Sequence, residues 1–273
     1  MVNPMENPRV REEMKKAMIK PLNDKSKVKK VIGIVSGKGG VGKSLVTGLS
    51  AVSASRAGYK TAIMDADITG PSIPKMFGVH QKAEIKTGEI YPLVTNSGIE
   101  IISLNLLTDN ETDPVIWRGP IIGGVVSQFW TDVVWGDIDV MFIDMPPGTG
   151  DVALTVFQSI PLDGIIVVTS PQDLVSMIVM KAINMAEMMD IPVLGIVENM
   201  SYLECPSCQE KIEIFGPSRA SEVAHQNKTV VLDRIPIDPD YAHLTDQGLI
   251  EFYLTDAMKG IPDLIKELME KNE

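Results

Sequence analysis

Cysteine is almost absent from this sequence of 273 residues, which contains only Cys205 and Cys208. A framework of several disulfides is therefore excluded, and the pair needs a local explanation. Positive charge is also in deficit, because 25 Lys and Arg face 36 Asp and Glu, for a formal net charge of -11. That balance disfavours general attraction to nucleic acid or to anionic lipid.

Long hydrophobic runs are missing as well. No apolar stretch approaches the ~20 residues that span a bilayer, and the N-terminus lacks the apolar core of a signal peptide. We therefore expect a cytoplasmic protein with no membrane or nucleic-acid partner. What is present is an ordinary globular composition, with 44% hydrophobic and 22% charged residues. The length lies near the upper limit for one hydrophobic core, so one large domain is expected.

The chain divides into a polar N-terminal arm, residues 1–30, which we expect to be mobile, and one predicted domain, residues 31–273. In that domain short apolar runs alternate with longer amphipathic stretches. This alternation predicts a doubly wound, mostly parallel α/β sheet, which binds its ligands beyond the carboxyl ends of the strands. The predicted strands are 31–36, 61–65, 99–104, 140–145, 164–169, 192–198 and 230–235.

Two further local elements are predicted. Apolar residues at helical spacing predict a helix over residues 43–57, and Gly58 follows where a left-handed residue would end it. Residues 82–94 are expected to form an exposed hairpin. Both elements belong to the same domain.

The loop after the first predicted strand carries the pattern G-x-x-x-x-G-K-[ST] between a strand and a helix. Its glycines let successive amides point inward, and the following helix adds the positive end of its dipole, so the loop forms an anion cradle. We expect Lys43 to contact the β and γ phosphates of ATP and the Ser44 hydroxyl to bind Mg²⁺. A Gly-rich turn without a ligand is the alternative. The loop consists of Gly37, Lys38, Gly39, Gly40, Val41, Gly42, Lys43 and Ser44.

Acidic residues end two of the predicted strands. Asp144 follows a buried apolar strand, which is the Walker B arrangement, and we expect it to hold Mg²⁺ directly or through water. Asp65 and Asp67 end the second strand, and a side-chain period of two places both on the side of the phosphates. Asp65 is also interpretable as a support for the loop, because carboxylates at strand ends are often turn residues.

Lys38 gives the loop a second lysine, and the pattern Lys-Gly-Gly-x-Gly-Lys-Ser resembles that of the deviant Walker A P-loop ATPases. The resemblance implies that Lys38 reaches across a dimer interface to the partner's nucleotide. It also implies that Asp67 lies in the first switch segment, near Mg²⁺ and the attacking water. Asn199 and the segment with Pro236 and Asp238 match the positions that contact adenine in this class. A capping role for Asn199 remains an alternative.

The spacing Cys205-Pro-Ser-Cys208 lets two thiolates bind one soft metal centre. A thioredoxin-like redox pair would favour a helix after the first cysteine, whereas residues 209–215 resemble a short strand. One chain cannot complete a zinc site, because it has no other cysteine and its three histidines lack suitable spacing. A two-fold dimer would bring four thiolates together and suit either zinc or an iron–sulfur cluster. Two unrelated cysteines are the remaining alternative.

Three further segments, residues 65–72, 146–151 and 195–202, resemble the Mrp family of ATP-dependent iron–sulfur carriers, and the resemblance extends from residue 28 to the C-terminus. It implies a homodimeric ATPase with slow, Mg²⁺-dependent hydrolysis. It further implies that Cys205 and Cys208 of two subunits hold a [4Fe-4S] cluster, which is passed to apo iron–sulfur proteins. Neither an N-terminal cysteine cluster nor an added N-terminal domain is found, which implies a minimal carrier.

Two other classes of protein remain as alternatives to the carrier. A partitioning or positioning ATPase, with a structural zinc at its dimer interface, uses a basic C-terminal helix or surface. Residues 261–273 instead carry four acids against two lysines. An electron-transfer ATPase like the nitrogenase iron protein takes its bridging cysteines from two separated loops, unlike the close pair here.

Overall fold

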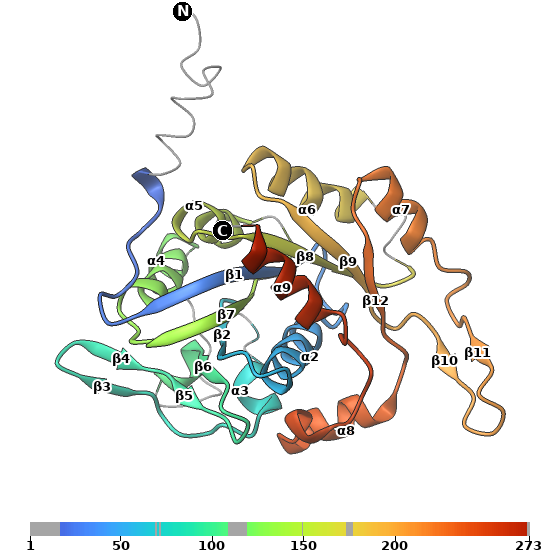
Figure 1. The fold of residues 1–273 in the computed structure, drawn as a ribbon, viewed down its shortest axis with the longest axis horizontal. Coiled ribbons are helices and arrows are strands. Elements are labelled where there is room, and N and C mark those ends of the chain that lie inside the picture. The colour runs from blue at the N-terminus through green and yellow to red at the C-terminus, as the bar shows by residue number, and fades with distance from the viewer. Residues whose placement is uncertain are drawn as a thin grey trace, which may run out of the picture.

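The computed structural model describes residues 17–68, 70, 72–108, 119–148, 150–172 and 177–271. At its centre is an eight-stranded sheet in the order β12-β9-β8-β1-β7-β2-β6-β5 (Figure 1). Every neighbouring pair is parallel except β5 with β6. The strands are β1 (Lys27–Ser36), β2 (Thr61–Asp65), β5 (Leu93–Val94), β6 (Glu100–Ile102), β7 (Asp137–Asp144), β8 (Gly164–Thr169), β9 (Val193–Glu198) and β12 (Val231–Arg234).

Helices cover both sides of this sheet, so the predicted doubly wound α/β architecture is confirmed. In Figure 1, α4, α5 and α6 lie along the upper side of the sheet, and α2 and α3 lie along the lower side. The helices are α2 (Lys43–Arg56), α3 (Ile73–Met76), α4 (Gly119–Thr131), α5 (Asp151–Ser159), α6 (Met177–Met188), α7 (Ala220–Gln226), α8 (Pro239–Gln247) and α9 (Ile261–Glu270), with short 3-10 turns η2 (Leu104–Leu106) and η3 (Ile250–Phe252).

The central strands are buried because their sequences are largely apolar. Every residue of β2 and of β8 is buried, as expected for parallel strands with helices on both faces. Helix α2 follows β1 and buries Val46, Leu49 and Val52 against the sheet. Gly58, with a φ of 91°, takes the left-handed conformation predicted beyond its end. The carboxyl ends of β1, β2 and β7 are thereby held at one edge of the sheet.

Strand β1 begins at Lys27, earlier than the predicted start at residue 31. Residues 27–30 therefore belong to the sheet and not to the arm. These residues pair with the neighbouring strand β7 from Lys27 onward, and Lys29 Nζ also lies 2.7 Å from Asp139 Oδ1 on that strand. The arm also contacts the domain, because the Lys20 amide donates a hydrogen bond to Ser159 O. Residues 1–16 of the predicted arm lie outside the described residues.

Two small antiparallel hairpins extend from the main sheet. The first, β3 (Glu84–Lys86) with β4 (Glu89–Tyr91), is the hairpin predicted within residues 82–94. The second, β10 (Leu203–Glu204) with β11 (Lys211–Ile212), projects from the β12 end of the sheet (Figure 1). We call the second one the cysteine hairpin, because both cysteines lie between its strands. No helix within the described ranges is long and apolar enough to cross a membrane.

Candidate functional site

The phosphate loop, residues 37–44, connects the end of β1 to the start of α2, as predicted. Gly40 and Gly42 both have a φ of 82°, in the left-handed region that favours glycine. A Cβ atom on Gly42 would lie 2.1 Å from Asn199 Nδ2. Gly42 is therefore required twice, by its backbone conformation and by the close approach of Asn199.

Lys43 is the buried cation of this edge of the sheet. Its Nζ lies 2.7 Å from Asp144 Oδ1 and 3.4 Å from Asp67 Oδ2. Burial by itself lowers the pKa of Lys43, but the charges of Asp144 and Asp67 outweigh burial, and the pKa is raised. Lys43 is therefore charged at the point where the sequence predicts the phosphates.

Asp144, at the end of β7, is the centre of a buried hydrogen-bond cluster. Its carboxylate accepts hydrogen bonds from Ser44 Oγ at 2.6 Å and from Thr47 Oγ1 at 2.9 Å, besides its ion pair with Lys43. The structure thus brings together Ser44 and Asp144, the two residues predicted to bind Mg²⁺. Thr47 was missed by the sequence analysis, although its position one helical turn after Lys43 would have indicated it.

The two acids that end β2 have different surroundings. Asp67 reaches Lys43, whereas Asp65 accepts hydrogen bonds from the Asp67 amide and from Ser103 Oγ, both at 3.1 Å. Burial, followed by the charge of Asp144, raises the pKa of Asp65 well above its usual range. Asp65 therefore supports the loop that carries Asp67, and Ser103 is a second residue that sequence analysis missed.

A cavity of about 430 Å³ lies beside the first turn of α2. It includes all three residues predicted to contact adenine, Asn199, Pro236 and Asp238. Its lining is mostly apolar, which suits the face of a flat heterocycle. We call this cavity the base pocket; it is lined by Leu45, Met76, Asn199, Met200, Pro236, Ile237, Asp238, Tyr241, Ala242, Thr245 and Asp246.

Asn199 links the base pocket to the phosphate loop. Its side-chain amide donates a hydrogen bond to Val41 O at 2.9 Å, and its backbone amide bonds Thr169 O at the end of β8. Asp238 has a structural task, since its carboxylate caps α8 through the Asp240 amide and accepts the Tyr253 hydroxyl. The Asp238 carboxylate is therefore already hydrogen-bonded within the protein. Asp238 contributes to the base pocket as part of its wall.

The cysteine hairpin presents two free thiols, with Cys205 half-buried and Cys208 exposed. The hairpin is closed by hydrogen bonds from the Cys205 amide to Glu210 O and from the Gln209 amide to Cys205 O. Amide hydrogen bonds from Cys208 and Ser207 to the sulfur lower the pKa of the Cys205 thiol. Such amides favour the thiolate, which is the form that binds metal.

Exposed apolar side chains adjoin the cysteines. Ile212, Ile214 and Phe215 have 46%, 51% and 41% of their surface exposed. Adjacent exposed apolar side chains are typical of surfaces that contact another protein. No group of three or more His, Cys, Asp or Glu side chains in the described part of the chain is arranged to hold a metal ion. The hairpin therefore offers two thiols and an apolar border.

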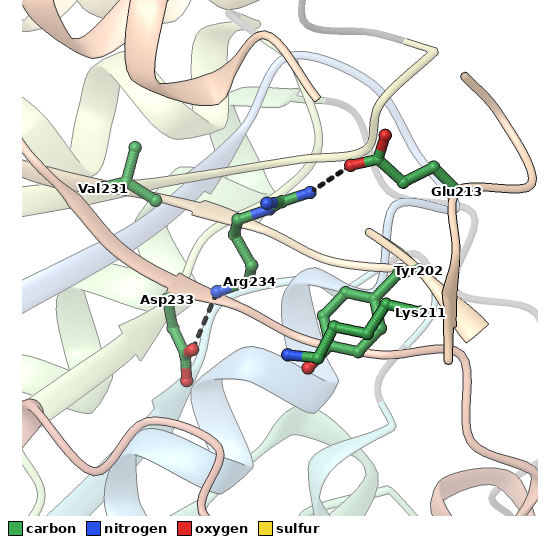
Figure 2. A pocket seen from close by; sticks show the side chains of 6 residues that line it. All are labelled: Tyr202, Lys211, Glu213, Val231, Asp233 and Arg234. Carbon is green, nitrogen blue, oxygen red and sulfur yellow. Dashed lines mark hydrogen bonds and ion pairs between the residues drawn. The ribbon is translucent and has the colours of Figure 1, made fainter. Parts of the chain in front are cut away.

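A second cavity, of about 530 Å³, lies between the cysteine hairpin and β12. Figure 2 shows Arg234 of β12 extending toward Glu213, which follows β11. Lys211 Nζ lies 4.4 Å from the centre of the Tyr202 ring, in a cation–π contact. The remaining lining residues are Val231 and Asp233.

The chain is similar to known proteins of one family. Residues 27–271 match the family model described as ParA, NUBPL iron-transfer P-loop NTPase. The chain is 44% identical to the iron-sulfur cluster carrier protein of Clostridium perfringens, covering 84% of this chain and 83% of the relative. It is also 44% identical to the protein of that name from Methanocaldococcus jannaschii, covering 91% and 87%.

Solved structures show the same relationship. A nucleotide-binding protein from Archaeoglobus fulgidus in complex with ADP is 41% identical, with a TM-score of 0.76, covering 90% of this chain and 94% of that one. The cell division ATPase MinD of Pyrococcus furiosus is 20% identical, with a TM-score of 0.59, covering 89% and 99%. At that identity the second match shows the fold alone.

Proposed function

Because the chain belongs to the NUBPL iron-transfer P-loop NTPase family, we propose that it is an ATP-hydrolysing carrier of iron–sulfur clusters. In this proposal two copies of the chain bind one cluster and pass it to apo iron–sulfur proteins in the cytoplasm. One observation carries the proposal. The same chain has a phosphate loop whose Lys43 is buried and paired with Asp144, and a thiol pair that supplies only half of the ligands of a cluster.

The nucleotide half of the proposal assigns ATP to the phosphate loop and the base pocket. Lys43 faces the β and γ phosphates, the loop amides surround them, and Asn199 and Pro236 contact the adenine. The ADP bound by the relative from Archaeoglobus fulgidus supports a nucleotide in a protein of this fold and sequence. The buried charge of Lys43 is what makes an anion favourable there.

Mg²⁺ fits the oxygen atoms that meet at this edge. The Ser44 hydroxyl and the Asp144 carboxylate lie 2.6 Å apart, and Asp67, like Asp144, forms an ion pair with Lys43. These are the hard donors that Mg²⁺ prefers, and few protein ligands suffice because phosphates and water fill its other positions. We assign Ser44 and Asp144 to the metal. When bound, the ion neutralises charge that develops on the phosphates.

Slow hydrolysis is proposed to need Asp67 and Lys38. Asp67 is held in place by Asp65, through the hydrogen bond to its backbone amide. Its carboxylate is therefore positioned to orient an attacking water or the metal. Lys38 is proposed to act on the nucleotide of the partner subunit, which makes the homodimer a requirement for turnover as well as for cluster binding.

The cluster half of the proposal assigns the cargo to Cys205 and Cys208 of two subunits. A [4Fe-4S] cluster takes four thiolates, so each chain contributes two and the cluster lies on the two-fold axis. The lowered pKa of Cys205 favours the thiolate. The exposed Ile212, Ile214 and Phe215 supply apolar surface that the second subunit would cover.

Anaerobic reconstitution with iron and sulfide tests the proposal. We expect a brown chromophore at one [4Fe-4S] cluster per dimer, and activation of an apo iron–sulfur enzyme when the loaded protein is added. A zinc-only product would contradict the carrier and would favour the positioning ATPase with a structural zinc. One full cluster per monomer would contradict the shared site, because two thiols cannot complete it.

A further inference from the structure

The cysteine hairpin is held at its base by two chain segments of different kinds. The leg that leads into it is bound through the backbone, since the Ser201 amide donates to Ile235 O at 2.9 Å and the Ile237 amide donates to Tyr202 O. The returning leg is bound through a side chain, by the 2.9 Å ion pair between Glu213 Oε1 and Arg234 Nη2. Both attachments are made to the segment that begins at the end of β12.

Arg234 is itself fixed from the interior of the protein. Its Nε lies 2.9 Å from Ser201 Oγ and 3.3 Å from Glu198 Oε2. The Glu198 side chain has no exposed surface, and one of its oxygens finds no hydrogen-bond partner in the described part of the chain. A buried carboxylate holds its cation firmly, because separating the two would leave a desolvated charge unpaired. The free end of the guanidinium then reaches out to Glu213, as Figure 2 shows.

The same interior segment forms part of the nucleotide site. Asn199 follows Glu198 directly, and its side chain donates to Val41 O in the phosphate loop. Pro236 and Ile237 line the base pocket, and Ile237 is also the residue bonded to Tyr202 at the base of the hairpin. A ligand that restrains the base pocket therefore also restrains the segment that begins at the end of β12. Both legs of the hairpin are attached to that segment.

We propose that Arg234 is a positioning residue that couples the base pocket to the cysteine hairpin through its ion pair with Glu213. The inference rests on the proposed function for the identity of the nucleotide and of the cargo. Nucleotide binding restrains the entering leg through the backbone and the returning leg through Arg234. The orientation of the cysteines thereby follows the state of the base pocket. By reciprocity, a ligand that orders the hairpin changes the affinity for nucleotide.

Glu213→Gln is the variant that isolates this ion pair. The Glu213 side chain is 39% exposed, and exposed ion pairs contribute little to the free energy of unfolding, so the variant should fold. Glu210→Gln is the matched control, because Glu210 is exposed on the same hairpin and its substitution removes the same charge. Arg234→Lys is the second variant, since it keeps a cation for Glu198 but a single ammonium cannot serve Glu198 and Glu213 together.

Hydrogen exchange on the full-length, metal-cluster-free protein, with and without Mg²⁺ and ADP, tests the coupling. In the wild type and in Glu210→Gln we expect ADP to slow exchange of the amides in Leu203–Ile212 by about threefold or more. In Glu213→Gln and Arg234→Lys the returning leg, residues 209–213, should change by less than about twofold, while the phosphate loop is protected as in the wild type.

Two outcomes would overturn the coupling. One is a wild-type hairpin that does not respond to ADP, and the other is a Glu213→Gln hairpin that responds like the wild type. The measurement needs no cluster, so its failure leaves the carrier proposal intact. A failed reconstitution would equally leave the exchange result standing. Absence of ADP protection in the phosphate loop itself would contradict both proposals.

Discussion

The phosphate edge, which comprises the phosphate loop with Asp65, Asp67 and Asp144, differs from the cysteine hairpin in how far one chain completes its own site. At the phosphate edge the key side chains are buried and paired within the chain, as Lys43 is with Asp144. At the hairpin the thiols are free and the neighbouring apolar side chains are exposed. The buried charges of the first region suit a small ligand, and the exposed apolar side chains of the second suit contact with another macromolecule.

This difference has a physical basis. Buried charges at the phosphate edge need a rigid frame, because a displaced partner would leave a desolvated charge. The frame comes from the strand ends of the sheet, which hold Asp67 and Asp144 in fixed positions. A carrier must also release its cargo, so the thiolates gain from lying on an exposed hairpin outside that frame. Removing the central groups of one region should therefore leave the ligand-binding groups of the other region in place.

The largest expected effect comes from removing a cysteine. Cys205→Ser and Cys208→Ser should each abolish cluster binding and weaken the dimer, because four thiolates are needed and only two remain. ADP affinity should stay within about twofold, since the substituted residue contributes nothing to the phosphate edge. Iron and sulfide analysis after anaerobic reconstitution, with ADP titration as the control, measures both. Variants that still load a cluster and activate an apo enzyme would rule out the carrier.

Removing Lys43 is the reciprocal test. Lys43→Ala should lower ATP turnover by about 10³-fold or more, because the transferring phosphoryl group loses a fixed positive charge in a dry site. Cluster loading should persist. Lys86→Ala is the control, since it also removes a lysine ion pair, but an exposed one, with Glu84. Steady-state hydrolysis at saturating Mg²⁺ and ATP decides the matter, and unchanged turnover would refute the assignment of the phosphate loop.

Lys38 tests whether the phosphate edge, unlike the cysteine hairpin, is formed by one chain alone. If it acts on the partner's nucleotide, the phosphate edge is not complete within one chain after all. Lys38→Ala should then keep ADP affinity within about threefold and lower turnover by about 10²-fold. Binding is measured by calorimetry and turnover by phosphate release. Equal losses of binding and turnover would instead place Lys38 in the site of its own subunit.

The sequence predicted what depends on local pattern. The bounds of β2 and β8 follow from unbroken apolar runs, and the phosphate loop follows from glycines at fixed spacing. It did not predict Ser103, whose hydrogen bond to Asp65 depends on how separate elements meet, and Thr47 was overlooked although it lies one helical turn after Lys43.

Ion pairs between residues that are far apart in the sequence could not be predicted either. Arg234 and Glu213 are separated by β12 and α7 along the chain, and no spacing rule connects them. The early start of β1 also depends on a distant segment, because Lys27 and Val28 pair with Asp137 and Ile138 of β7. Local pattern therefore identified the phosphate loop and the cysteine pair as candidates, but the contacts that connect them to the sheet are visible only in the fold.

The smallest expected effect concerns Glu100, an acid that lies outside both regions. Its titration contributes to the pH dependence measured for either region. Burial, only partly offset by Lys60, raises the pKa of Glu100 from 4.5 to about 7. Oε2 of Glu100 is buried without a hydrogen-bond partner among the described residues, so its charged form is poorly compensated. Burial also raises the pKa of Asp65 at the phosphate edge, but that carboxylate accepts two hydrogen bonds.

Glu100→Gln should therefore change how stability depends on pH. A raised pKa in the folded state means that the wild type loses free energy of unfolding as the pH rises from about 4.5 through about 7. The full shift corresponds to about 3 kcal/mol, which solvent screening of this half-buried side chain reduces to about 1 kcal/mol. Urea unfolding of the nucleotide-free protein should show Glu100→Gln more stable than the wild type at pH 8, with the difference vanishing at pH 4. An equal difference at both pH values would mean that the substitution acts through packing and not through the charge.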